Sequence, residues 1–469
     1  MLEILNRLDS FVWGPPLLIL LVGTGIYLSL RLGLLQIFRL PRAFRLIFVS
    51  DEEHQGDVSS FAALCTALAA TVGTGNIIGV ATAIKTGGPG ALFWMWIVAL
   101  LGMATAYAES ALAQLYKVND HHGLYRGGPA FYISRGLKSP WAGAVFSVAL
   151  LVVFGLVFNA VQANAISESF SESFGLDRTQ VGVGVAVLSG IVIFGGIRNI
   201  ARVAEVVVPF MAVAYLGVAL WVLVANVDKI PDVLVLIVRS AFGMDQAVGG
   251  VVGGMTAAML NGVKRGLYSN EAGMGSAPNI AAVAIPSPHH PSSQGFVQAL
   301  GVFIDTILIC TATGVMILMS DALQPGSGVT GTVLTQHALA YHIGDHGKDF
   351  VALAVFFFAF TSIIGNYSYA EGALTYLNIN NKPCLFILRT LVLVFIVWGA
   401  REAITTVFDA ADAVMGIMAI INLVGITLLS GLVVKLTRDY FEQAKHGDPR
   451  FRLSDYPELK GQIEEEIWK

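Results

Sequence analysis

Long apolar blocks separated by short polar connections dominate the chain. About eleven blocks approach or exceed the length of a spanning helix, near residues 12–30, 59–85, 90–116, 141–167, 180–196, 203–226, 247–283, 296–319, 350–376, 383–400 and 406–434. A run of about 20 apolar residues matches the hydrocarbon thickness of a bilayer at 1.5 Å per helical residue. The pattern therefore predicts an all-α polytopic membrane protein with about eleven transmembrane helices.

The composition supports this class. Hydrophobic residues make up 55% of the 469 positions, charged residues only 13%, and the mean hydropathy is +0.70. Soluble domains carry about a quarter charged residues, so a soluble globular protein is excluded. Cys65, Cys310 and Cys384 lie in or beside apolar blocks without paired spacing, which indicates small buried residues rather than disulfides or metal ligands. The N-terminus lacks the basic start of a cleaved signal peptide.

Basic residues alternate between connections and predict the orientation. Lys and Arg are concentrated at 31–45, 117–138, 198–202 and 435–452, whereas the connections near 87, 168–177 and 320–349 are poor in them. Basic loops stay on the cytoplasmic side of a membrane. We therefore expect a multi-pass protein of the inner (plasma) membrane, with its N-terminus outside and its C-terminus in the cytoplasm.

Two apolar blocks contain glycine-rich interruptions. The first reads AATVGTGNIIG at 69–79, and the second reads GMGSAP at 273–278. Without the first block, ten remain, and these breaks open two groups of five that run in opposite directions. Matching broken helices are the best sequence indication of an inverted-repeat transporter. Glycines can instead serve only as close-packing positions, but two polar-flanked breaks favour a binding site. A nucleotide-phosphate loop is excluded, since no strand precedes the motif and no GK[ST] follows it.

The expected organisation follows from this division. Residues 1–58 form an N-terminal transmembrane helix and a basic cytoplasmic loop, 59–230 the first five-helix repeat, 231–434 the inverted second repeat, and 435–469 a cytoplasmic tail.

A broken helix supplies its own ligands. Freed backbone amides at the start of a half-helix bind anions, and freed carbonyls at the end of the preceding half-helix bind cations. Because unsatisfied backbone groups cost several kcal/mol in lipid, such a break persists only beside protein, water or ligand. One unwound segment can thus hold a carboxylate and a sodium ion close together.

Several charged residues lie at membrane depth, where insertion costs at least about 2.5–3.5 kcal/mol. These are Glu109, Lys264, Arg265, Glu271, Asp305 and Glu371. They either take part in coupling or hold helices together. In the structural alternative, Lys264 and Arg265 neutralise Asp305 or Glu109.

Uncharged polar residues at the same depth are candidate ligands. Thr361 and Ser362 offer hard oxygens suited to sodium, although adjacent hydroxyls also bond to their own helical turn. Asn366 lies one turn further on, on a similar face. Gln162 can meet a substrate amine or amide, or simply link two helices.

The sequence contains no catalytic arrangement. It has no metalloprotease HExxH, no GxSxG nucleophile elbow and no ATP-binding motif, so we expect neither an enzyme nor a cofactor, and no nucleic acid partner. The histidines, including the pair His289–His290, lack metal-ligand spacing and are expected to be solvated.

Five long motifs carry a family resemblance: ALCTALAATVGTGNIIGVATAI, GGPGALFWMWIVALLGMATAYAE, RGGPAFYI, GVKRGLYSNEAGMGSAPN and FIDTILICTATG. Over nearly its whole length the chain resembles the alanine/glycine:cation symporter family, transporters of the amino acid–polyamine–organocation type. The resemblance implies a leucine-transporter-like fold and sodium-coupled (in some members proton-coupled) uptake of small neutral amino acids. The alternative, an ion channel or an uncoupled membrane-embedded binding protein, would be expected to show repeated filter sequences, which the chain lacks.

The resemblance also assigns residues. It implies that the amides of Thr74, Gly75 and Asn76 face the substrate carboxylate, and that the pocket is lined by Gln162, Asn270, Gly273, Met274 and Asn366. Sodium would be held by the carbonyls of Ala69 and Val72 with the hydroxyls of Thr361 and Ser362. Some relatives carry a large aromatic residue in place of Asn366. The smaller side chain predicts tolerance of substrates larger than alanine, such as serine or glutamine.

Overall fold

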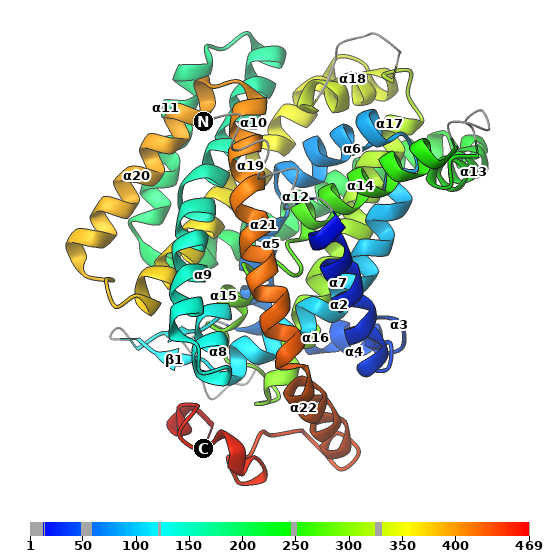
Figure 1. Cartoon of the computed structure of the whole chain (residues 1–469). Helices are drawn as coiled ribbons and strands as arrows, with labels where there is room; N and C mark the ends of the chain where they lie inside the picture. The colour runs from blue at the N-terminus through cyan, green and yellow to red at the C-terminus, as the bar shows by residue number, and fades with distance from the viewer. Residues whose placement is uncertain are drawn as a thin grey trace.

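The computed structural model describes residue 13 and residues 15–47, 59–120, 123–244, 251–323 and 331–468. The start of the first apolar block, the end of the first basic loop and part of the 320–349 connection lie outside the described residues. Elsewhere the chain is almost entirely helical, as predicted (Figure 1).

The helical elements, in chain order, are α2 (Pro15–Arg31), α3 (Leu35–Phe38), α4 (Leu40–Leu46), α5 (Ser60–Thr71), η2 (Gly75–Gly79), α6 (Val80–Gly87), α7 (Ala91–Leu115), α8 (Pro129–Gly136), α9 (Pro140–Val152), η3 (Val153–Val157), α10 (Phe158–Phe174), α11 (Arg178–Ile193), α12 (Gly196–Ala225), η4 (Val227–Lys229), α13 (Ile230–Ala241), α14 (Val251–Asn270), α15 (Pro278–Ala281), α16 (Pro291–Val302), η5 (Phe303–Cys310), α17 (Thr311–Leu318), α18 (Gly331–Ile343), α19 (His346–Tyr376), α20 (Lys382–Arg401), α21 (Ile404–Leu428), α22 (Ser430–Gln443), η6 (Leu453–Asp455), η7 (Pro457–Leu459) and η8 (Glu465–Trp468). Strands β1 (Val118–Asn119) and β2 (Tyr125–Arg126) pair antiparallel, Val118 opposite Arg126.

Within the described residues, six helical segments are long and apolar enough to cross a membrane, or up to eight if each of two bent pairs counts as one span. The polytopic membrane class is therefore confirmed, while eleven spans remain a prediction. Helix α12 illustrates the outer layer. Val206, Phe210 and Val213 recur at helical spacing and are 72%, 65% and 73% exposed, whereas Tyr215 and Met211 on the other side are buried. Such an apolar outer face suits lipid.

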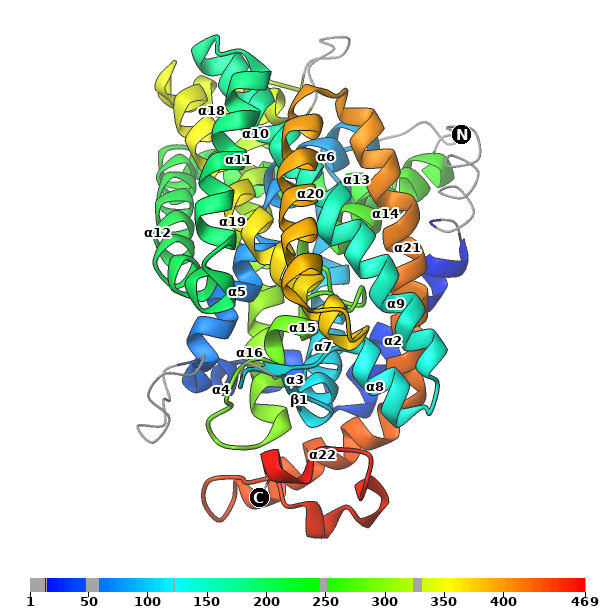
Figure 2. The ribbon, with the colours of Figure 1, turned by 90° about the vertical axis from the view of Figure 1, so that its left-hand side faces the viewer.

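Helices α5 and α19 run through the interior of the bundle (Figures 1 and 2), where α5 packs against α19 and η2 packs against α14. Helix α5 begins where Ser59 Oγ accepts a 3.0 Å hydrogen bond from the amide of Ala62, an N-cap of about 1 kcal/mol. Helix α7 packs along α14 and α16, and α19 packs against α5, α10 and α12. This packing places both glycine-rich interruptions inside the protein rather than in lipid.

The C-terminal residues fold back across one end of the bundle, below α16 in Figure 2. The indole Nε1 of Trp468 donates to the carbonyl of Leu115 at 3.2 Å, and the amide of Phe451 donates to the carbonyl of His289 at 3.0 Å. His290 is fully buried beneath this segment and contacts Asp439 at 3.3 Å. The expectation of a solvated His289–His290 pair is therefore wrong for His290, because the tail covers it.

Candidate functional site

The first interruption is a true break. Helix α5 ends at Thr71, a π-helical turn starts at Gly75, and the two halves bend by 54°. The amide of Gly73 donates to Oδ1 of Asn76 at 2.9 Å, and the amide of Thr74 donates to Oε1 of Gln162 at 3.1 Å. In a continuous helix these amides would donate to the carbonyls four residues back, which are those of Ala69 and Ala70.

The break therefore frees carbonyls at the end of α5. The carbonyls of Ala69 and Ala70 lose the donors that a helix supplies. The amide of Asn76 donates to the carbonyl of Gly73 at 3.2 Å instead of to Val72, so the carbonyl of Val72 loses its helical donor as well. These groups are buried, and π-turns of this kind recur at functional sites.

The second interruption follows α14 directly. Glu271, Gly273 and Gly275 have φ of 56°, 97° and 80°, and helix resumes only at Pro278. Positive φ favours glycine, and a Cβ at Gly275 would fall 2.5 Å from Cγ of Pro129. Both breaks expected from the glycine pattern are thus confirmed.

The first break contacts the end of α14, directly before the second break. A Cβ at Gly75 would lie 3.0 Å from Cα of Ser269 in the last turn of α14. Nδ2 of Asn76 donates to Ser269 Oγ at 3.0 Å and to Asp305 Oδ1 at 2.9 Å. The buried carboxylate of Asp305 also accepts from Ser269 at 2.6 Å and from Thr306 at 2.8 Å. Asp305 thus ties η5 to both breaks through neutral donors.

Helix α19 faces the first break through Ser362. A Cβ at Gly73 would fall 2.3 Å from Ser362 Oγ, and one at Gly365 would fall 2.8 Å from Cβ of Ala70. This close approach sets the Ser362 hydroxyl beside the end of α5. Ser362 also donates to the carbonyl of Phe358 at 3.0 Å, so the back-bonded alternative holds at the same time.

Two further predicted residues, Thr361 and Asn366, lie on α19 with Ser362. Thr361 donates to the carbonyl of Phe357 at 2.9 Å and faces Met211 of α12 at 3.9 Å. Nδ2 of Asn366 donates to Oδ1 of Asn159 at 3.1 Å, and its own buried Oδ1 has no hydrogen-bond partner among the described residues. A buried amide oxygen without a donor is costly and marks Asn366 as a candidate substrate contact.

The 270–277 segment faces a small cavity on its α7 side. The space measures about 20 Å³ and is lined in part by Thr71, Glu109 and Asn270, enough for about one water molecule. Nδ2 of Asn270 donates to Thr306 Oγ1 at 3.1 Å, and Gly273 and Met274 are buried.

Comparison with known proteins assigns the family. A sequence profile described as the sodium:alanine symporter family matches residues 1–453. The chain belongs to this family. It is accordingly an integral membrane transporter and not an enzyme.

Relatives within the sodium:alanine symporters are similar over almost their whole length. The chain is 45% identical to the probable sodium/glutamine symporter GlnT of Bacillus subtilis over 96% of this chain and 93% of the relative. It is 44% identical to the amino-acid carrier protein AlsT of the same organism, over 98% and 96% of the two chains. It is 41% identical to the sodium/alanine symporter AgcS of Methanococcus maripaludis, over 95% and 98%.

The charges of this symporter-family member pair differently from the expectation. Nζ of Lys264 lies 2.7 Å from Oδ2 of Asp412, not beside Asp305 or Glu109, so the predicted pairing of Lys264 is wrong. The Arg265 guanidinium lies 5.6 Å from the centre of the Tyr268 ring. Sequence reasoning could not supply the partner because Asp412 belongs to α21, far along the chain.

Glu109 is held by a residue that the sequence analysis missed. Nδ2 of Asn422 donates to the carboxylate of Glu109 and, at 3.0 Å, to the carbonyl of Gly273, while Oδ1 of Asn422 accepts from Tyr132. Asn422 thereby fixes the second break to α7, α8 and α21. The only sequence signal for Asn422 was its position as a lone asparagine in an apolar run. Ser269, which bonds to Asn76 and Asp305, had a still weaker sequence signal.

Proposed function

We propose that this protein couples inward sodium movement to the uptake of small neutral amino acids, alanine and glycine foremost, by alternating access. The observation that carries the proposal is the change of hydrogen-bond acceptors at the first break. The amides of Gly73 and Thr74 donate to side chains and not to the carbonyls at the end of α5, and the Ser362 hydroxyl lies close to Gly73. Family membership and the names of the relatives support the same conclusion.

The substrate carboxylate would bind at the start of the second half-helix, at the amides of Thr74, Gly75 and Asn76. Those amides carry partial positive charge. The Thr74 amide already holds an oxygen acceptor, Oε1 of Gln162. On binding, the carboxylate takes this place, and the released Gln162 oxygen accepts from the substrate ammonium group.

The sodium ion would bind on the other side of the break. The carbonyls of Ala69 and Val72 and the hydroxyls of Thr361 and Ser362 are hard oxygen donors, the kind that such a cation prefers. Of the two hydroxyls, Ser362 has the better position, since Thr361 faces α12. Because the ion and the carboxylate share one unwound segment, each raises the affinity for the other.

The pocket would close against the second break and α19, with Asn270, Gly273, Met274 and Asn366 as its lining. We further propose about eleven spans in a leucine-transporter-like arrangement, with repeats at 59–230 and 231–434. In this arrangement the N-terminus faces outward and the tail from 435 to 469 is cytoplasmic. The contact of the first break with Ser269, directly before the second break, supports a single shared site at the interface of the repeats.

One sodium ion suffices energetically. A potential of about 100 mV supplies about 2.3 kcal/mol per charge, and a tenfold sodium gradient adds about 1.4 kcal/mol. Together they hold an amino acid gradient of roughly 500-fold, enough for nutrient uptake.

The test is uptake by the purified protein in sealed liposomes. An imposed inward sodium gradient should drive labelled alanine above its external concentration, and replacing sodium by potassium should abolish accumulation. An imposed proton gradient without sodium separates the two possible coupling ions. Equilibration without accumulation under every gradient would instead indicate a channel, and the absence of any flux would indicate an uncoupled binding protein.

A further inference from the structure

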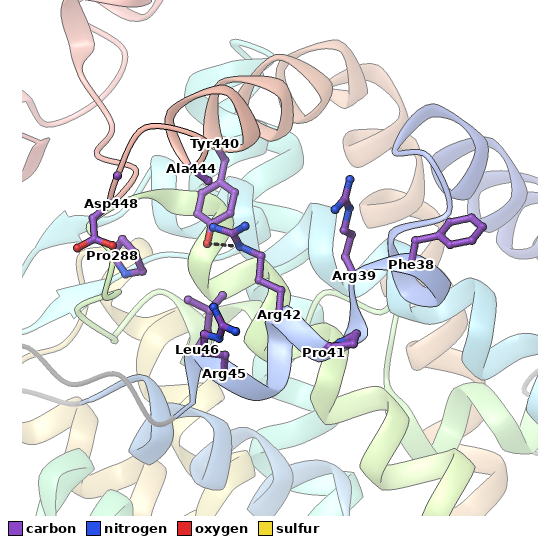
Figure 3. Close-up of a pocket in the computed structure, with 11 residues that line it drawn as sticks. Phe38, Arg39, Pro41, Arg42, Arg45, Leu46, Pro288, Tyr440, Ala444 and Asp448 are labelled. Atoms are coloured by element: carbon purple, nitrogen blue, oxygen red, sulfur yellow. Dashed lines mark hydrogen bonds between the residues drawn. The ribbon is translucent and has the colours of Figure 1, made fainter.

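A basic pocket lies away from the proposed transport site, where α3 and α4 run along the edge of the bundle beside α22 (Figure 1). Arg39, Arg42 and Arg45 recur at three-residue spacing, which places them on one side of a helical segment. They line a cavity of about 470 Å³ together with Tyr440 and Asp448. Figure 3 shows the Arg42 side chain reaching toward the Tyr440 ring.

The pocket carries an excess of positive charge. Its lining contains three arginines against one carboxylate, that of the exposed Asp448. Among the described residues, no carboxylate lies within ion-pair distance of Arg39, Arg42 or Arg45. Such a cluster attracts an anion, and guanidinium groups match phosphate oxygens in particular.

Aromatic contacts hold two of the arginines in place. Nε of Arg42 donates to the Tyr440 hydroxyl at 3.2 Å, and its guanidinium lies 4.8 Å from the centre of that ring. The guanidinium of Arg39 lies 4.7 Å from the centre of the Phe441 ring. One bond from Nε leaves the other guanidinium donors of Arg42 available, so the pocket is organised before a ligand arrives.

Large apolar side chains flank the basic pocket. On the same two short helices, Ile37 and Phe38 are 57% and 67% exposed, and Phe44 is 40% exposed. In Figure 3, Phe38 points away from Arg42 and Arg45. Arginines beside exposed aromatic and aliphatic side chains are typical of a membrane interface, where the charge meets head groups and the apolar groups enter the acyl region. Binding of a free anion would not require the exposed apolar side chains.

We propose that this pocket binds the phosphate head group of an anionic phospholipid, with Arg42 and Arg45 on the phosphate and Ile37 and Phe38 against its acyl chains. The bound lipid bridges α4 to α22 through Arg42 and Tyr440. This inference goes beyond the proposed transport function and does not depend on it, because it concerns lipid binding rather than solute flux.

The test uses the full-length protein purified in a mild detergent, with phosphatidylglycerol and phosphatidylcholine as probes. Native mass spectrometry should find phosphatidylglycerol retained in preference to phosphatidylcholine. The R42Q/R45Q variant should lose affinity for phosphatidylglycerol by about 25-fold, since each arginine near an anionic surface contributes about fivefold. The control R438Q/R450Q also removes two positive charges. Both of its arginines are exposed and neither lines the pocket, so this variant should retain the lipid.

Each outcome bears on the proposal. Equal retention by R42Q/R45Q and the control variant would overturn it, as would displacement of phosphatidylglycerol by inorganic phosphate at equal concentration, because that result assigns the pocket to free phosphate. If R42Q/R45Q does not fold, the R45Q variant alone serves, since Arg45 is exposed. It should show about a fivefold loss, and an unchanged affinity would contradict the assignment.

Discussion

The backbone amide of Thr74 donates a 3.1 Å hydrogen bond to Oε1 of Gln162, 88 positions along the chain. A side chain from α10 thus occupies a backbone donor that an unbroken helix would satisfy itself. This contact places Gln162 at the proposed substrate site. Replacing Gln162 therefore tests whether its side chain binds the substrate or only links two helices.

Replacing Gln162 by leucine should weaken alanine binding by about tenfold, the loss expected when one hydrogen bond to a charged group disappears. Leucine keeps most of the volume but offers no acceptor for the substrate ammonium. Equilibrium binding of labelled alanine in saturating sodium measures the effect. The neighbouring Asn164→Leu exchange is not a suitable control, because Asn164 bonds to the carbonyl of Gly399. Val161→Leu is the control for a change of side-chain volume on the same helix, because it removes no polar group. If Gln162→Leu binds alanine normally, the side chain only links helices.

Adding one methyl group at Gly75 should be more harmful than adding one at Gly79. A Cβ at Gly75 would lie 3.0 Å from Cα of Ser269, whereas at Gly79 nothing lies within 4 Å. Gly75→Ala should therefore push the two breaks apart and raise the KM for alanine by at least about tenfold, as a small misplacement in a preorganised site does. Gly75→Leu should abolish binding.

Gly79→Ala supplies the matched control within the same π-turn and should transport normally. Both variants should remain folded in the membrane, as size-exclusion chromatography can verify. An unchanged KM in folded Gly75→Ala protein would remove the contact between the breaks from the site.

Ser362→Ala should raise the sodium concentration needed for half-maximal uptake by about fivefold, because one neutral oxygen ligand contributes about 1 kcal/mol. Ser368→Ala is the control. Ser368 is buried on the same helix and bonds to the carbonyl of Ile364 at 3.4 Å. Sodium titrations of uptake compare the two variants. Equal sodium dependence would assign the Ser362 hydroxyl to helix packing.

Asn366 should set the upper size of the substrate. Asn366→Phe should lower the ability of glutamine to compete with labelled alanine by at least about tenfold, in the range that loss of pocket volume produces, and should reduce alanine uptake much less. Asn366→Ala should preserve glutamine competition. The prediction fails if no amino acid larger than alanine competes in the unaltered protein.

Acidification should loosen the C-terminal segment. Burial lowers the pKa of His290, although the hydrogen bond and charge of Asp439 oppose this shift. Because the pKa of His290 is lower in the docked state than in an undocked, solvated state, the undocked state binds a proton more readily. Protonation therefore favours undocking, and docking weakens as the pH falls below the usual histidine value of 6.5. Above that value the contribution is fully present.

Hydrogen exchange of residues 451–468, corrected for the intrinsic pH dependence of amide exchange, measures this loosening between about pH 7.5 and 5.5. His290→Gln should flatten the dependence. His446→Gln, at an exposed position between α22 and this segment, should leave it intact. Identical pH profiles for all three proteins would show that another group controls docking.

The breaks could be predicted from local sequence because glycine within a long apolar run has few structural reasons to recur with polar neighbours. Residues near the breaks, such as Gln162 and Ser362, were likewise visible as polar groups at membrane depth. The partners of polar and charged residues could not be predicted in the same way. The contact of Lys264 with Asp412, for example, depends on how α21 packs, and no local pattern encodes that arrangement.

The burial of His290 escaped prediction for a related reason. A histidine pair in a polar connection has the local pattern of a solvated loop, but Asp439 and Tyr440 of α22 and Phe451 beyond it pack against the His290 ring. Asn422 reaches Glu109 and Gly273 through a similar long-range contact.

The most direct test is an experimental structure determined with sodium and alanine bound. Density for the amino acid should lie within hydrogen-bond distance of the Thr74–Asn76 amides, and an ion should lie between the carbonyls of Ala69 and Val72 and the Ser362 hydroxyl. Continuous helices through 69–79 and 269–278, or a solute bound away from both, would contradict the account.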